Sequence, residues 1–215
     1  MSKIISIDEA VSKVKDGMTI MIGGFLANGS PQTIIDALLK SNVKNLTLIC
    51  NDTAFPDRGL GMLIANKQVK KVITSHIGTN PSTIDQFNAK EIEVEFNPQG
   101  TLAERVRSAG AGLGGFLTPT GLGTVVAEGK EVITVDGKEF LLEKPLRADV
   151  ALLGASIADQ EGNLVYLGTT QNFNPLMAMA ADIVIAEVAE LKETGDIPME
   201  TVHTPGIFVD FMVRK

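Results

Sequence analysis

The stretch that decides the fold is Asp16-Gly17-Met18-Thr19-Ile20-Met21-Ile22-Gly23-Gly24-Phe25-Leu26-Ala27-Asn28-Gly29-Ser30-Pro31. The apolar run Thr19 to Ile22 predicts a buried parallel strand, and the glycines after it let the backbone turn or lie against another group. Ser30-Pro31 predicts a helix start with Ser30 as the N-cap, because an apolar stripe follows it. We therefore expect a strand, a glycine turn and a helix whose free N–H groups suit an anionic ligand, the alternative being an ordinary βα turn.

Two later segments repeat this pattern of a strand followed by a polar turn. The run Leu46 to Cys50 predicts a second buried strand and ends in Asn51-Asp52-Thr53, while Val69 to Ser75 predicts a third strand followed by a glycine turn and a helix. Ile92 to Phe96 alternates with glutamates, which predicts an edge strand. Strands that end in such turns indicate an α/β fold with a ligand site at the carboxyl ends of the strands.

The second half of the chain interrupts this alternation. Asp136-Gly137 lies between two short apolar runs and predicts a β-hairpin with a type I′ turn. Core strands resume at Val150 to Leu153 and at Ile183 to Ala186, with a helix from Phe173 to Ala181 between them. We expect a single α/β domain over residues 1–215, with an open, mostly parallel sheet flanked by helices and an inserted β-hairpin.

The amino-acid composition argues against several classes of function. Of the 215 residues, 44% are hydrophobic and 21% charged, which is typical of a folded globular protein, and the net charge of −7 argues against a nucleic-acid surface. One cysteine and two histidines predict no metal site and no internal disulfide. Ser6-Ile7-Asp8-Glu9 is a capping box that predicts a first helix ending near Gly17. The acidic Asp8 and Glu9 stand where a signal peptide would need a basic start and an apolar run. With no apolar run of membrane-spanning length, we expect a cytoplasmic protein.

Three residue patterns are candidates for chemistry. Gln99 follows a predicted strand, where its amide could donate to a thioester or carboxylate oxygen as charge develops there, or it is a solvated turn residue. Cys50 could be a thiol nucleophile, although without a neighbouring histidine a buried structural cysteine is favoured. Gly110-x-Gly112-x-x-Gly115 matches the dinucleotide fingerprint but lacks the strand that should precede it. The isolated carboxylates Asp52 and Glu104 form no acid and base pair, so no catalytic nucleophile is evident.

Four segments together resemble one family. The stretch Asp16 to Pro31, the run Asn97 to Arg105, the loop Gly110 to Gly123 and the run Gln171 to Pro175 resemble the α subunits of the family I coenzyme A transferases that act on acetate, butyrate and acetoacetate. The glycine-rich loop Gly110 to Gly123 is also the kind of segment that packs closely against a partner chain or a ligand. The resemblance covers nearly the whole chain.

The resemblance implies a ping-pong reaction through a glutamyl-CoA thioester on a glutamate of a β subunit, so this chain would supply no nucleophile and would assemble as α2β2. It implies no permanently bound cofactor, because the CoA thioester is the substrate. Gln99 would polarise the thioester oxygen, and Asn51 would support the reacting carboxyl group. The implied CoA-binding loop consists of Gly23, Gly24, Phe25, Leu26, Ala27, Asn28 and Gly29. Two alternatives stay open, namely a sugar-phosphate or acyl-ligand sensing domain and a self-sufficient hydrolase.

Overall fold

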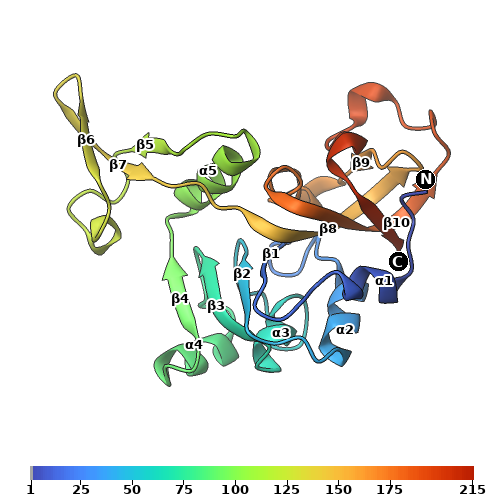
Figure 1. The fold of residues 1–215 in the computed structure, drawn as a ribbon, viewed down its shortest axis with the longest axis horizontal. Helices are drawn as coiled ribbons and strands as arrows, with labels where there is room; N and C mark the ends of the chain where they lie inside the picture. The colour runs from blue at the N-terminus through green and yellow to red at the C-terminus, as the bar shows by residue number, and fades with distance from the viewer. Residues whose placement is uncertain (1) are drawn as a thin grey trace.

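The fold centres on one twisted, mostly parallel sheet (Figure 1). The computed structural model describes residues 2–215. The sheet follows the order β11-β10-β8-β1-β2-β3-β4, in which every neighbouring pair is parallel, and β9 adds an antiparallel pairing to the end of β8. Its strands are β1 (Thr19–Ile22), β2 (Leu46–Ile49), β3 (Val69–Thr74), β4 (Glu93–Phe96), β8 (Ala148–Asp159), β9 (Leu164–Val165), β10 (Ala181–Lys192) and β11 (Phe211–Arg214). The predicted parallel sheet is confirmed, and β4 is an edge strand as expected.

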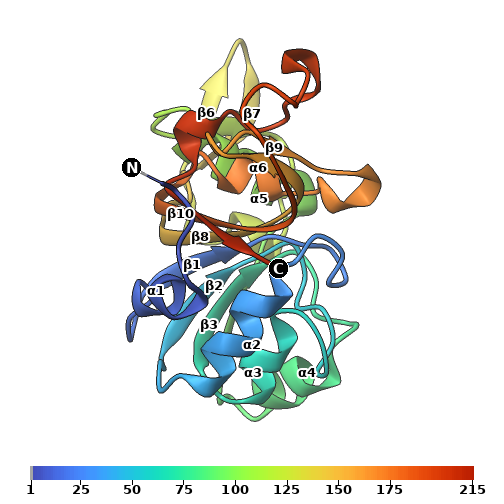
Figure 2. The same cartoon turned by 90° about the vertical axis from the view of Figure 1, so that its right-hand side faces the viewer.

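Helices cover both faces of the sheet (Figures 1 and 2). One face carries α1 (Ile7–Ser12), α2 (Gln32–Lys40), α3 (Gly61–Ala65) and α4 (Pro81–Asn88), and the other carries α5 (Gln99–Gly110) and α6 (Asn174–Met177). A hydrophobic core lies on each face of the sheet. Strand β1 contributes side chains to both cores, because successive side chains of a strand point to opposite faces. Ile20 and Ile22 pack with the side chains of α2, whereas Met21 packs with Leu102 of α5.

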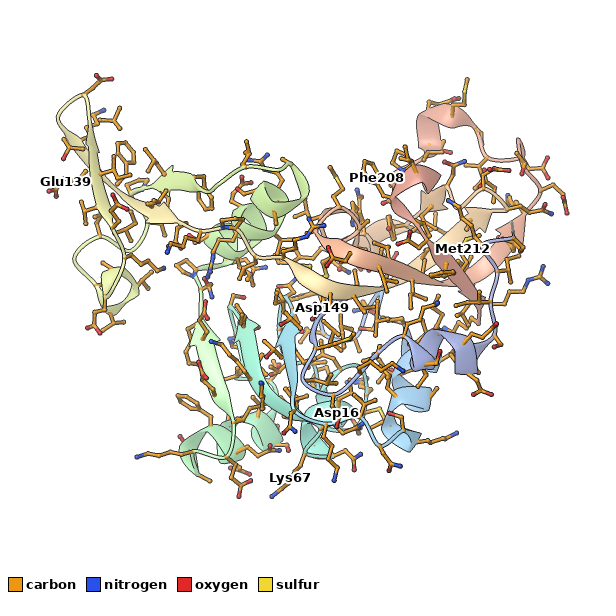
Figure 3. The ribbon with its side chains drawn as sticks, in the orientation of Figure 1. Asp16, Lys67, Glu139, Asp149, Phe208 and Met212 are labelled. Carbon is orange, nitrogen blue, oxygen red and sulfur yellow. The ribbon has the colours of Figure 1, made fainter. Side chains whose placement is uncertain are left out.

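A small antiparallel sheet stands away from this body as an arm (Figure 1). It consists of β5 (Phe116–Thr118), β7 (Lys138–Glu143) and β6 (Val132–Val135) in that order. Asp136 and Gly137 join β6 to β7 with φ of 51° and 74°, the two positive values that a type I′ turn requires, so the predicted hairpin is confirmed. Figure 3 shows Glu139 on this arm, on the opposite side of the molecule from Met212 in β11.

Several predicted boundaries were wrong. The first helix keeps its capping box but ends at Ser12, well before Gly17, and the helix expected from Phe173 to Ala181 is limited to the four residues of α6. Strands β8 and β10 each run for twelve residues, beyond the apolar cores that predicted them, because they pair with each other along almost their whole length. Short 3-10 turns lie in four of the connections, at Val125–Ala127, Gly168–Thr170, Met199–Thr201 and Gly206–Phe208. Among the described residues, no helix has the length and apolarity needed to cross a bilayer.

Candidate active site

The glycine stretch after β1 forms a two-residue turn at the carboxyl edge of the sheet. The N–H of Phe25 donates to the carbonyl of Asn28 at 3.0 Å, and the N–H of Asn28 donates back to Phe25 at 2.9 Å. Leu26 and Ala27, at the tip, have φ of 49° and 69°, a conformation that L-residues seldom adopt. The carboxylate of Asp52 accepts the N–H of Leu26 at 3.0 Å. This bond helps to hold the strained tip in place.

Asp52 is a buried support for that turn. It lies after β2, and its two carboxylate oxygens accept the N–H groups of Leu26 and Ala54. Burial raises the pKa of this carboxyl group, although both backbone bonds and the nearby His76 lower it. Asp52 thus ties the turn after β1 to the turn after β2.

The glycines of the stretch are needed for close packing within the chain. A Cβ atom on Gly23 would overlap Oδ1 of Asn174, and one on Gly29 would lie 2.5 Å from the carbonyl oxygen of Thr170. Gly24 has φ of +124°, and a Cβ atom there would overlap the hydroxyl of Ser30. The close approach that the sequence predicted is therefore made, in these places, by the chain's own side chains and backbone.

The side chain of Asn172 hydrogen-bonds to the backbone of the glycine turn at two positions. Its Oδ1 accepts the N–H of Gly24 at 3.1 Å, and its Nδ2 donates to the carbonyl of Asn28 at 3.0 Å. Asn174, two residues further on, donates to the carbonyl of Gly29 at 3.1 Å. Sequence reasoning did not assign these asparagines a role; the signal available was three carboxamides in the run Gln171 to Pro175, with no apolar pattern to explain them.

Asn51 and Gln99 form an amide pair beside this turn. Nε2 of Gln99 donates to Oδ1 of Asn51 at 2.6 Å, and the Ser75 hydroxyl donates to Oε1 of Gln99. Gln99 is the first residue of α5 and not part of a turn before it, because Pro98 already takes the N-cap position. A Gln side chain has two N–H donors, so one remains for another acceptor. The structure thus brings together the two predicted catalytic residues.

An open depression of ≈ 530 Å³ lies over this amide pair. It is lined by Phe25, Asn51, Gln99, Gly168, Thr169, Gln171 and Asn172. No residue in this lining carries a formal charge. Of the seven residues predicted to form the CoA-binding loop, Phe25 alone lines this depression. Ala27, Asn28 and Gly29 line a separate hollow of ≈ 450 Å³, together with residues of β8 and β10.

The N-terminus of α2 is not a free anion site, contrary to the sequence prediction. Ser30 is not its N-cap, because Pro31 takes that position and the Ser30 hydroxyl donates to the carbonyl of Gly23 at 3.1 Å. The buried carboxylate of Glu187 on β10 accepts the N–H of Ile34 at 3.0 Å and also bonds to Thr33. The chain therefore fills this helix N-terminus with its own carboxyl group, and burial raises the pKa of Glu187 despite these bonds.

The remaining candidates show structural roles. Cys50 is fully buried, and burial raises the pKa of its thiol well above the usual range, which favours the structural interpretation over a nucleophile. Gly110 ends α5 and Gly115 precedes β5, so the dinucleotide fingerprint lacks its strand and helix context. Glu104 is paired with Arg107 on the exposed face of α5. Within residues 2–215, no cluster of three potential metal ligands is found.

Fold and site together define a class of protein. The parallel α/β sheet has the fold of an acyl-CoA transferase from Escherichia coli O157:H7, solved as a thioester complex with CoA. That structure superposes with a TM-score of 0.85 at 24% identity over 100% of this chain and 47% of its own, so the chain spans about half its length. Glutaconate CoA-transferase from Acidaminococcus fermentans superposes with a TM-score of 0.87 at 21% identity, over 99% of this chain and 75% of its own.

Sequence comparison gives the family. The chain belongs to the coenzyme A transferase family, whose model matches residues 4–215. It is 53% identical to the acetate CoA-transferase subunit alpha of Escherichia coli K12, over 99% of this chain and 96% of the relative. It is also 53% identical to the acetoacetyl-CoA:acetate/butyrate CoA transferase alpha subunit of Clostridium acetobutylicum, over 100% of this chain and 98% of the relative. The resemblance drawn from the four sequence segments is confirmed.

Proposed function

We propose that this chain is the α subunit of a heteromeric transferase that moves CoA between a short-chain acyl-CoA or 3-oxoacyl-CoA and a carboxylate such as acetate, butyrate or acetoacetate. The observation that carries the proposal is the hydrogen-bonded pair of Gln99 and Asn51 in a depression whose lining contains no carboxylate. Such a surface can donate to an oxyanion but offers no carboxylate nucleophile. The high identity to α subunits of named two-subunit enzymes supports the same division of labour.

In the proposed reaction a glutamate of the β subunit attacks the thioester carbonyl and expels the CoA thiolate, which leaves an acyl anhydride. The thiolate then attacks the glutamyl carbonyl of that anhydride, which releases the first carboxylate and forms the glutamyl-CoA thioester. A second carboxylate reverses these steps and leaves with CoA. Negative charge develops on a carbonyl oxygen in each step, and donors fixed in advance stabilise that charge most effectively.

Gln99 is the donor proposed for this oxygen. Its Oε1 accepts from Ser75 and one of its N–H groups is bound to Asn51, so the direction of the second N–H is set before the substrate arrives. Preorganisation of this kind avoids the reorganisation that water would need. Asn51, itself buried and fixed after β2, then acts by orienting Gln99 and by shaping the floor of the depression.

The experiment is to measure CoA transfer from acetoacetyl-CoA to acetate and to butyrate with this chain alone and with a co-expressed β subunit. We expect transfer only in the co-expressed complex. Trapping the complex with acyl-CoA and borohydride, followed by peptide mass analysis, should locate the reduced glutamyl thioester in the β subunit. Full activity of this chain alone would contradict the proposal, since its own residues would then include the nucleophile.

A further inference from the structure

The ring of Phe25 is an unusual feature of the candidate site. It is 46% exposed although it lies at the end of a buried strand, and it lines the depression above the amide pair. The other lining residues are glycine or carry a carboxamide or hydroxyl group. Phe25 is therefore the one large apolar surface that this depression offers to a ligand.

The backbone from which this ring extends is held in place. Phe25 exchanges two hydrogen bonds with Asn28 across a turn whose tip residues both have positive φ, and the buried carboxylate of Asp52 holds the tip. Strained conformations of this kind persist only where surrounding structure enforces them, and they gather at functional sites. Asn172 braces the same turn from the other side through Gly24 and Asn28. The point from which the ring extends is thus fixed at the edge of the depression.

A second turn in the chain provides an internal comparison. Phe55 and Arg58 also close a short turn, after β2, and the Arg58 guanidinium lies over the Phe55 ring at 4.2 Å from its centroid. Cation–π packing covers that ring. Among the described residues, no cation is stacked on Phe25 in this way, so its face stays available.

We propose that Phe25 is a specificity-determining residue, whose ring forms the side wall for the hydrocarbon chain of a short acyl group while Gln99 binds the carbonyl oxygen. This inference rests on the proposed function. Gln99 and Phe25 line the same depression, so an acyl group held at its oxygen would extend its first methylene groups along the ring. Because the depression is open, the ring flanks the chain and does not close off its end.

A side wall of this kind predicts that the preference for an acyl substrate grows with the length of its hydrocarbon chain. Butyrate has two methylene groups more than acetate, and each buried methylene favours binding by roughly 4-fold when it is fully removed from water. Contact with one wall supplies part of that effect. The side wall should therefore strengthen the binding of butyrate and its thioester, and it should affect the binding of acetate very little.

The test uses the co-expressed complex and measures kcat/KM for acetate and for butyrate as acceptors of CoA. Phe25→Ala should lower the butyrate-to-acetate ratio by about 3- to 10-fold, and Phe25→Leu should lower it less, because leucine restores part of the apolar wall. Phe55→Ala is the matched control, since it removes a phenylalanine from the neighbouring turn without altering the depression. Size-exclusion chromatography checks that each variant complex is assembled.

The outcomes separate this inference from the proposed function. If the wild-type complex transfers CoA but Phe25→Ala slows acetate and butyrate equally, the side wall is refuted and Phe25 serves only the loop or the subunit contact. If Phe25→Ala speeds transfer to longer acids such as hexanoate, the ring is an end stop and the inference is again wrong. A wild-type complex without transferase activity would overturn the proposed function itself.

Discussion

Asn51 and Gln99 lie 48 positions apart in the sequence, and a hydrogen bond of 2.6 Å from Nε2 of Gln99 to Oδ1 of Asn51 joins them at the carboxyl edge of the sheet. Asn51 follows β2, and Gln99 begins α5 directly after β4 and its short connection. Strand β3 separates β2 from β4, and its successor Ser75 bonds to both residues of the pair. Three strand ends therefore cooperate to orient one amide.

Gln99→Ala should lower kcat of the co-expressed complex by about 100- to 1,000-fold, the usual loss when one oxyanion donor is removed, which corresponds to roughly 2.7–4 kcal/mol of barrier. KM should change little, because the donor is proposed to act mainly in the transition state. Steady-state kinetics with acetoacetyl-CoA and acetate measure both parameters. Gln160→Ala, an exposed glutamine bonded to Glu193, is the matched control and should retain wild-type kinetics. Unchanged turnover in Gln99→Ala would remove this residue from the reaction.

Asn51→Ala should slow turnover through its effect on Gln99. Losses from Asn51→Ala and Gln99→Ala should therefore be far from additive, because residues of one hydrogen-bond network couple by about 0.5–3 kcal/mol. A double-mutant cycle on kcat measures that coupling. Additive losses would mean that Asn51 acts on the substrate independently, and the orienting role would have to be given up.

Gly24→Val should abolish turnover and destabilise the chain. Valine at φ of +124° is strained, by about 1–3 kcal/mol, and its Cβ would overlap the Ser30 hydroxyl. The N–H of Gly24 would then lose its bond to Asn172, so the turn could not hold its place. Thermal unfolding and activity of the complex are the measurements. Gly195→Val is the control, since it has a similar φ of +95° but open space around it, and it should be active although less stable.

Much of the fold could be predicted because its signals are local. Thr19 to Ile22, Leu46 to Cys50 and Val69 to Ser75 are short apolar runs that end in turn residues, and each is a strand in the structure. Asp136-Gly137 identified the hairpin for a similar reason, since few residues suit two successive positive φ values. The lengths of the strands were less predictable than their positions. The extensions of β8 and β10 depend on pairing between segments that are far apart in sequence.

The candidate site was only partly accessible from the sequence. Local turn chemistry identified the glycine stretch, and the position of Gln99 after a predicted strand made it a candidate donor. The resemblance to a family supported Gln99 and added Asn51. The capping of α2 by Glu187 could not be foreseen, because this contact spans 153 positions and β10 carries no motif there. Ser30-Pro31 matched the local rule for a helix start, but the Ser30 hydroxyl instead bonds to Gly23. Tertiary contacts overrode local preference at both positions.

Cys50→Ala should leave turnover within about 2-fold of wild type. The thiol is fully buried and burial raises its pKa, so it is neither ionised nor accessible at neutral pH. For the same reason the folded chain should resist iodoacetamide and should be alkylated only after denaturation, which mass spectrometry can follow. Rapid alkylation of the native complex with parallel loss of activity would support the thiol nucleophile instead.

Glu187→Gln should change how the stability of the complex depends on pH. Burial raises the pKa of Glu187 in the folded chain above its unfolded value, so between these two values the folded state binds more protons than the unfolded state. The contribution of Glu187 is therefore greatest below the unfolded pKa, about 4.3, and declines as pH rises through the folded pKa. Glutamine cannot ionise, and its Oε1 can still accept the N–H of Ile34.

The measurement is the unfolding midpoint of the wild-type complex minus that of the Glu187→Gln complex. This difference should fall as pH increases from about 4 and then level off. Glu190→Gln, an exposed position on the same strand, is the matched control and should follow wild type. A difference that rises with pH would mean that the carboxylate form is favoured at the N-terminus of α2, so the helix dipole would outweigh the cost of burial.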